Sequence, residues 1–260
     1  MAKKKIIILA AFLAVILTLA VVWAVFTDII ILRKTEYMAG TENAVSILFV
    51  GSSQVFVGNV PRQLRAIAMT RGVEINFKDI SRHGNRGGTL GELREAAISE
   101  MRSGRFDYVV LQDQTRRSLN NVEGLLDEIR ILCDTAREYG AVPVLYNSAW
   151  ATVNGRPDEG RLNISTQVYK RAADENDAVL INAAGAWIYA YQTIPGISLY
   201  TRFDPRGPHA SKAGGFLTAC VFAAELFDLH ITEVPRDGLY KRSDAVSLAQ
   251  TAWEFVTDNE

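Results

Sequence analysis

The chain has 260 residues, of which 48% are hydrophobic and 22% are charged, and this length is enough to bury a sizeable core. Its 28 basic and 29 acidic residues give a formal net charge of -1, so the chain lacks the excess of positive charge that nucleic-acid-binding proteins use. The composition favours a globular protein and does not indicate a nucleic acid partner.

The first 34 residues differ in composition from the rest of the chain. Lysines at positions 3–5 precede the uncharged apolar run of residues 6–26, which can cross a bilayer as a helix of about 20 residues. Trp23 and Phe26 are bulky where a cleavage site has small side chains, so an uncleaved anchor is favoured over a cleaved signal peptide. We predict a single-pass membrane protein with a transmembrane signal anchor at residues 1–34 and an extracytoplasmic domain after it.

Residues 35–44 show no clear periodicity and are predicted to be a linker, and residues 45–260 are predicted to form one domain. Five segments of this domain have the β-branched and aromatic composition of strands. These predicted strands are residues 46–50, 73–77, 107–111, 142–146 and 178–181.

Segments with helical periodicity separate and follow the strands. The predicted helices are residues 61–72, 91–103, 122–139, 161–176, 183–192, 211–229 and 245–256. Strands that alternate with helices indicate βαβ units. We therefore predict an α/β fold with a five-stranded, doubly wound parallel sheet.

The two cysteines, Cys133 and Cys220, both lie in apolar helical patterns. Buried free thiols are the favoured interpretation. A disulfide is the alternative, since an extracytoplasmic domain can form one. No cysteine or histidine spacing resembles a metal site, so we expect no metal ion and no cofactor.

Gly51, Ser52 and Ser53 directly follow the first predicted strand. Glycine permits a sharp turn, and the ligands of open α/β sheets bind at the carboxyl ends of strands. A serine at this place can act as a nucleophile where a base lies near it. The alternative is a turn that caps a helix, because the same residue types do this.

Three histidines could supply a base: His83 in a glycine-containing loop, His209 before an apolar helix, and His230 after it. His230 is expected to be solvated or to cap the helix. Asp204 precedes His209 by five residues, and the chain order serine, aspartate, histidine is one that catalytic triads use. The alternative role of Asp204 is that of a turn or cap residue.

These segments resemble the sequence blocks of the SGNH (GDSL-like) hydrolase family over roughly residues 45–229. Gly51-Ser52-Ser53 resembles the block with the nucleophile, which places Ser53 in that role. Gly87 resembles the glycine whose backbone N–H binds the oxyanion, and His209 resembles the base before the last helix of the family domain. The resemblance implies a three-layer, flavodoxin-like fold and the hydrolysis of ester bonds.

Two positions depart from the family pattern. The block after the third strand usually has an asparagine, but here the sequence is Gln112-Asp113-Gln114. Gln114 is the first choice for a side-chain amide at the oxyanion and Gln112 the second, and the alternative is that both bind the loop backbone. The acid usually lies three residues before the histidine, where this chain has Arg206. Either Asp204 reaches the histidine or the site works as a dyad.

Together, the predicted anchor and the resemblance imply a membrane-anchored esterase with Ser53, His209 and Asp204 as catalytic residues and with Ser53, Gly87 and Gln114 at the oxyanion. The expected partner is a small-molecule or glycan ester, and O-acetyl groups on a glycan are one candidate substrate. The alternative is a binding or scaffold protein of the same fold with weak or no catalysis. A phosphate-binding protein is disfavoured, because no Walker or dinucleotide-binding pattern follows the first strand.

Overall fold

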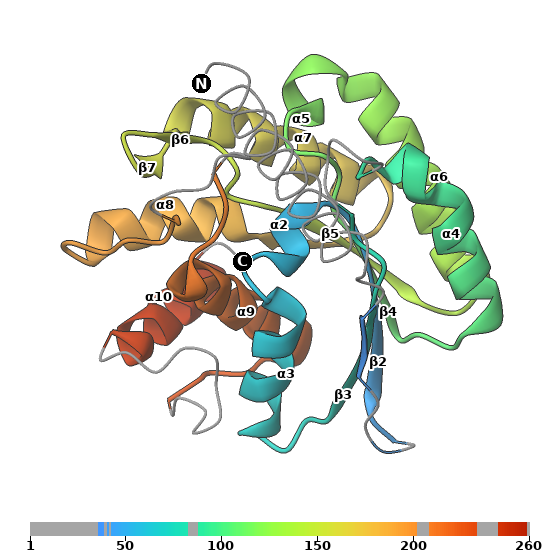
Figure 1. Cartoon of the computed structure of the whole chain (residues 1–260), viewed down its shortest axis with the longest axis horizontal. Coiled ribbons are helices and arrows are strands. Elements are labelled where there is room, and N and C mark those ends of the chain that lie inside the picture. Colours follow the sequence, from blue (N-terminus) through green and yellow to red (C-terminus); the bar gives the residue numbers. More distant parts are fainter. Residues whose placement is uncertain are drawn as a thin grey trace, which may run out of the picture. The chain divides into compact units, whose positions relative to one another are not determined.

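The computed structural model describes residues 36–38, 41, 43–82, 88–201, 208–232 and 244–258 (Figure 1). The predicted signal anchor at residues 1–34, with its apolar run at 6–26, lies outside these ranges. Among the helices within them, none combines the length and the apolar composition that a membrane span requires. The membrane anchor stays a prediction from the sequence.

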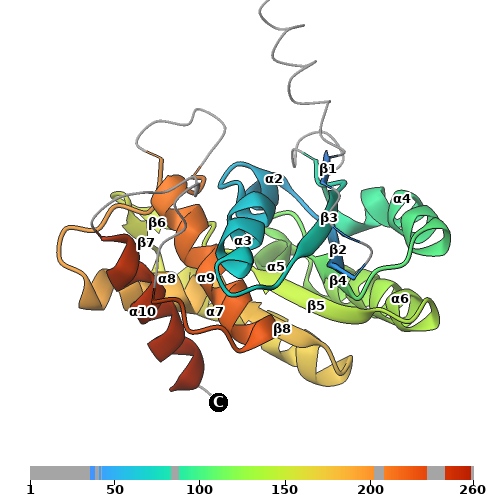
Figure 2. The same ribbon diagram turned by 90° about the horizontal axis from the view of Figure 1, so that it is seen from below.

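A six-stranded sheet forms the centre of the described domain, in the order β1-β3-β2-β4-β5-β8 (Figure 2). Its parallel strands are β2 (Val45–Val50), β3 (Ile75–Asp79), β4 (Tyr108–Leu111), β5 (Val142–Asn147) and β8 (Val179–Asn182). Numbered along the chain, these five strands lie in the flavodoxin-like order 2-1-3-4-5. The predicted five-stranded parallel sheet is confirmed.

The sheet has one further strand at its edge, β1 (Glu36–Met38), which pairs antiparallel with β3. The prediction of a linker over residues 35–44 misses this strand, because three residues are too few to show alternation. The β3 strand also begins two residues later than predicted. The N–H of Val73 donates to the carbonyl of Ala68 at 3.0 Å, in a turn where Gly72 has a φ of +77°, and this turn delays the strand.

The side chains of β2 point alternately into two hydrophobic clusters. Ile47 and Phe49 belong to one cluster and Leu48 and Val50 to the other, and none of the four has any exposed surface. Because successive side chains of a strand face opposite sides of the sheet, both faces are covered. The domain therefore has three layers, as expected.

Helices cover both faces of the sheet (Figure 1). On one face lie α4 (Leu90–Ser103) and α6 (Val122–Glu138). On the other lie α3 (Val60–Met69), α8 (Ala183–Thr193), α9 (Lys212–Phe227) and α10 (Ala245–Thr257), and α7 (Glu159–Glu175) contributes to both clusters. Each predicted helix has a counterpart. The elements that were not predicted are short: α2 (Ser53–Phe56), α5 (Arg117–Asn120), β6 (Thr152–Val153) and β7 (Arg156–Pro157).

Both cysteines are buried free thiols, as predicted. Cys133 lies in the cluster under α6 and Cys220 in the cluster under α9, on opposite faces of the sheet. Burial raises the pKa of the Cys133 thiol to about 12 and also raises the pKa of Cys220. The two side chains are therefore separated core residues and not a disulfide.

Helix α9 packs closely against the chain between α2 and α3. A β-carbon at Gly215 would lie 2.0 Å from the carbonyl oxygen of Gly58, so the two backbones leave no room for a side chain. The Nε2 of Gln63 donates to that same carbonyl at 2.8 Å and to the carbonyl of Lys212 at 3.2 Å. These contacts join the start of α9 to the segment that follows β2.

Gly215→Ala should lower the free energy of unfolding by about 1–3 kcal/mol, because the added methyl group overpacks this contact. Gly160→Ala in α7 is the control, since a β-carbon there would lie 3.6 Å from its nearest neighbour. Alanine should raise helix stability at that position by up to about 1 kcal/mol. Urea unfolding of both variants measures the difference, and equal stabilities would contradict the close packing.

Candidate active site

The candidate site lies at the carboxyl ends of the neighbouring strands β2 and β4. Gly51 turns the chain so closely past β4 that a β-carbon there would lie 2.9 Å from the carbonyl oxygen of Gln112. Ser52 then caps α2, and its Oγ accepts a hydrogen bond from the N–H of Gln54 at 3.4 Å. Since Ser52 provides the cap, the hydroxyl of Ser53 is available for another role.

Ser53 and His209 meet at this edge although they are 156 residues apart in the chain. The Oγ of Ser53 lies 2.8 Å from the Nε2 of His209. Both side chains are buried, with exposed fractions of 6% and 3%. An imidazole that accepts at Nε2 can take a hydroxyl proton over such a distance. The structure thus brings together the residues predicted as nucleophile and base.

The backbone around His209 is tied to the segment before it. Its carbonyl accepts hydrogen bonds from the N–H of Thr201 at 2.9 Å and from the hydroxyl of Thr201 at 3.3 Å. Two residues later, the N–H of Ser211 donates to the carbonyl of Leu199 at 2.7 Å. These bonds fix the path of the chain on both sides of the imidazole.

Gln54 links the turn after β2 to the segment of the histidine. Its Nε2 donates to the carbonyl of Pro208, the residue before His209, at 3.0 Å, and its side chain is 6% exposed. The sequence pattern does not predict this role. The available signal is a long amide side chain directly after the candidate nucleophile, and its burial becomes visible only in the folded chain.

Gln112 supports the same turn from the end of β4. Its Oε1 accepts from the N–H of Ser52 at 2.9 Å and from the hydroxyl of Ser52 at 2.8 Å. Its Nε2 donates to the carbonyl of Asp113. The Oε1 of Gln112 therefore holds the turn after β2 and its Nε2 binds the backbone after β4, which is the alternative role that the sequence left open for it.

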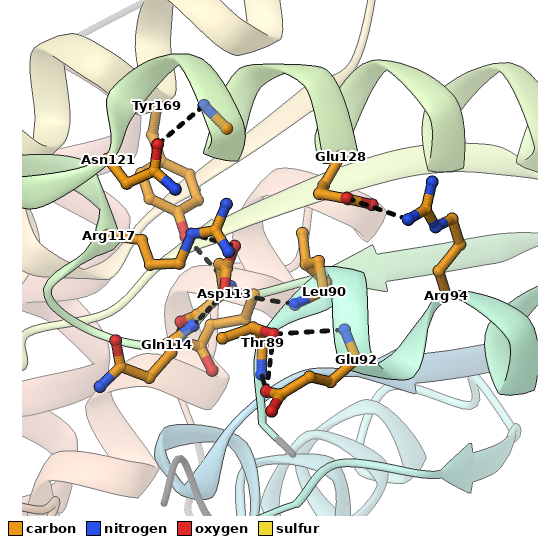
Figure 3. Close-up of polar contacts among 12 residues, drawn as sticks. Thr89, Leu90, Glu92, Arg94, Asp113, Gln114, Arg117, Asn121, Glu128 and Tyr169 are labelled. Atoms are coloured by element: carbon orange, nitrogen blue, oxygen red, sulfur yellow. Dashed lines mark hydrogen bonds and ion pairs between the residues drawn. The ribbon is translucent and has the colours of Figure 1, made fainter.

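Two donors at the site are unengaged within the described residues. The backbone N–H of Ser53, at the start of α2, meets no acceptor there, and neither does the half-buried side-chain amide of Gln114. Figure 3 shows the Gln114 amide directed away from Asp113 and Arg117. Of the two glutamines, Gln114 is thus the one whose amide can still bind a ligand.

Asp113 is a buried carboxylate at the end of β4, with 1% of its surface exposed. Its Oδ1 accepts from the N–H of Leu90 at 3.2 Å and from the N–H of Gln114 at 2.5 Å (Figure 3). Burial raises its pKa to about 6, although Arg117 and the two N–H groups act in the opposite direction. The effect of burial on the pKa of Asp113 is thus larger than the opposite effects of the hydrogen bonds and of Arg117.

Three residues considered from the sequence lie outside the described ranges: Asp204, Gly87 and His83. His230 is described, and its Nε2 lies 2.8 Å from the Oε1 of Gln250, while its ring stacks on Trp253 at 4.9 Å. It therefore connects the segment after α9 to α10. No group of three histidine, cysteine, aspartate or glutamate side chains within the described ranges could hold a metal ion.

No family model and no curated protein matches the chain. Solved structures do match it. A candidate SGNH hydrolase from Slackia heliotrinireducens has a TM-score of 0.56 at 22% identity, over 71% of this chain and 100% of its own. A DUF4886 family protein from Bacteroides uniformis has a TM-score of 0.64 at 16% identity, over 83% of this chain and 95% of its own.

An acetylxylan esterase from Geobacillus stearothermophilus, solved as a catalytic mutant, has a TM-score of 0.55 at 14% identity. This match covers 72% of the present chain and 97% of the esterase. At such identities the likeness shows a shared fold. The chain therefore has the fold of SGNH hydrolases, as its motifs predict.

Asp113→Asn tests the cost of burying the carboxyl. Because the pKa rises on folding from an ordinary 3.8 to about 6, the group contributes stability that is present below pH 3.8 and lost as the pH rises through 6. The free energy of unfolding of the wild type, relative to the variant, should fall by roughly 3 kcal/mol between about pH 4 and about pH 7. Urea unfolding across this range measures it, and a difference independent of pH would contradict the expected burial cost.

Proposed function

We propose that the chain is a serine esterase that hydrolyses a carboxylic ester, with Ser53 as nucleophile and His209 as base. The 2.8 Å separation of Ser53 Oγ and His209 Nε2 is the observation that supports this most directly. A fold alone does not determine an activity. The pair supports the proposal because it lies at the carboxyl edge of a sheet whose fold SGNH hydrolases share.

In the proposed acylation, the Nε2 of His209 takes the hydroxyl proton while the Oγ of Ser53 attacks the ester carbonyl carbon. The carbonyl oxygen becomes an oxyanion, to which the N–H of Ser53 and the amide of Gln114 donate. The bond to the alcohol oxygen then breaks, and the imidazolium gives its proton to that oxygen. The products of this half are an acyl-serine and a free alcohol.

Deacylation repeats these steps with water. His209 takes a proton from the water while the water oxygen attacks the acyl carbon, and the Oγ of Ser53 then leaves and regains a proton. We assign Asp204 to orient the imidazole and Gly87 to donate its N–H to the oxyanion. Motif resemblance supports the role of Gly87, and the chain order serine, aspartate, histidine supports that of Asp204; both residues lie outside the described ranges. None of these steps requires a cofactor.

We propose a short acyl group, such as acetyl, on a small molecule or a glycan as the substrate. One of the similar folds is an acetylxylan esterase, which supports this class. We also propose that residues 1–34 anchor the chain in the cell membrane with the catalytic domain outside the cytoplasm. The apolar run at residues 6–26 and the lysines at positions 3–5 support that location.

A second candidate function is ligand binding or scaffolding without efficient turnover. It is favoured by the absence of the usual asparagine after β4 and by the five-residue distance from Asp204 to His209. This candidate predicts the same geometry with little hydrolysis. Activity measurements therefore separate the two functions.

Ser53→Ala should reduce hydrolysis of p-nitrophenyl acetate by at least about 10³-fold, because it removes the attacking oxygen. The matched control is Ser103→Ala, which removes an exposed hydroxyl at the end of α4. The control should keep the wild-type rate. Unchanged hydrolysis in Ser53→Ala would refute the assignment, and absent hydrolysis in the wild type would favour the binding protein.

Gln54→Glu should lower kcat by roughly 10- to 100-fold with little change in KM, because a misplaced base slows the chemical step. The substitution keeps the shape of the side chain but sets a carboxylate oxygen against the carbonyl of Pro208, where Nε2 donated at 3.0 Å. The exposed Gln167→Glu in α7 is the control for the added charge. Equal kcat values in the two variants would show that Gln54 does not position His209.

A further inference from the structure

We propose that Asp113 is a positioning residue for the oxyanion side of the site, a role that rests on the proposed function. Its carboxylate, held by Arg117, joins the start of α4 to the turn after β4 that presents Gln114 (Figure 3). Asp113 touches no substrate in this scheme. It acts through the backbone and amide of Gln114.

A single oxygen of Asp113 joins two segments of the chain. The Oδ1 accepts two hydrogen bonds, one from the N–H of Leu90, the first residue of α4, and one from the N–H of Gln114. Leu90 itself is fully buried in the cluster under α4. The turn that contains Gln114 is therefore attached to the buried start of α4. Because the backbone of Gln114 is held there, the position of its side-chain amide is restricted.

The second oxygen of Asp113 faces a cation. Its Oδ2 lies 3.5 Å from the Nε of Arg117, and the Asp113 side chain has no exposed surface. This is the distance of an ion pair but not of a good hydrogen bond, and neither atom has a hydrogen-bond partner within the described ranges. Attraction between the charges thus directs Oδ2 toward α5 and leaves Oδ1 facing the two N–H groups.

The backbone of Asp113 is connected to the nucleophile turn and to α7. Its carbonyl accepts from the Nε2 of Gln112, whose Oε1 holds Ser52. Its N–H donates to the hydroxyl of Tyr169 at 3.2 Å. A shift of Asp113 would therefore move both the turn before Ser53 and the turn of Gln114.

The choice of a carboxylate at this place needs a reason beyond packing. Asparagine could accept both N–H bonds at its Oδ1 without burying a charge, and a buried charge destabilises a fold unless it is well paired. Burial raises the pKa of Asp113 to about 6 and so disfavours its ionised form. Such a shift in a group beside a candidate site is typical of functional carboxylates.

Several charged or titratable groups surround Asp113 and contribute to its ionisation. Glu128 of α6 raises its pKa, whereas Arg117 of α5 lowers it. Arg94 of α4 pairs with Glu128 at 3.3 Å and reduces the influence of that carboxylate. The groups that act on Asp113 from the packed elements are Arg117 (α5), Glu128 (α6) and Tyr169 (α7). From α4, Glu92 interacts with Arg117 and Arg94 with Glu128.

The test is the pH dependence of ester hydrolysis in the full chain. In the wild type, protonation of Asp113 should lower kcat by roughly 10-fold in addition to the loss of the base at His209, so log kcat should show an added step of about one unit near pH 6. Asp113→Asn should lower kcat at neutral pH by roughly 10-fold with KM within about two-fold, and should remove that step. Asp127→Asn, which removes an exposed carboxylate of α6, is the control and should match the wild type.

Arg117→Gln is a second variant, for use where Asp113→Asn does not fold. Because Arg117 lowers the pKa of Asp113, its removal should move the acid limb of kcat to higher pH. A wild-type profile without that step, or pH profiles of both variants that match the wild type, would overturn the positioning role while leaving Ser53-dependent hydrolysis intact. Absence of hydrolysis in the wild type itself would overturn the proposed function, and the role of Asp113 with it.

Discussion

The parallel pairing of β2 with β4 is the constraint on which the candidate site depends. Val50 lies opposite Leu111, so both strands end at the same level of the sheet. The helices that follow them lie on opposite faces, with α3 over one cluster and α6 over the other. The connections after β2 and β4 therefore run to opposite faces of the sheet, and the space between them is where ligands of such sheets bind. The contact of Gln112 with Ser52 then fixes the turn of the candidate nucleophile.

The candidate base, His209, reaches this edge through a second set of contacts, made by the segment before α9. Close packing of Gly215 on Gly58 seats the start of α9 beside the segment after β2, and Gln54 binds the carbonyl before His209. The hydrogen bond between Ser53 and His209 is consequently the product of backbone packing and of two glutamine side chains. A site built this way is sensitive to changes outside the reacting pair.

Most of the helices and strands, and the candidate pair of Ser53 and His209, could be predicted from the sequence. Long segments of strand or helix periodicity show their type because many side chains repeat the pattern, whereas β1, α2 and α5 have four residues or fewer. Ser53 and His209 follow from motif order. The roles of Gln54 and Gln112 could not be predicted, because a polar side chain becomes buried only when distant segments meet. The contacts of the buried Asp113 come from α4, α5 and α7 together.

The central claim is that His209 activates Ser53, and covalent labelling tests it most directly. A fluorophosphonate ester should form one adduct, located by peptide mass spectrometry on Ser53. In His209→Gln the rate of that labelling should fall by at least about 10³-fold, since the hydroxyl loses its base. An adduct on another residue, or an unchanged rate of Ser53 labelling in His209→Gln, would contradict the account.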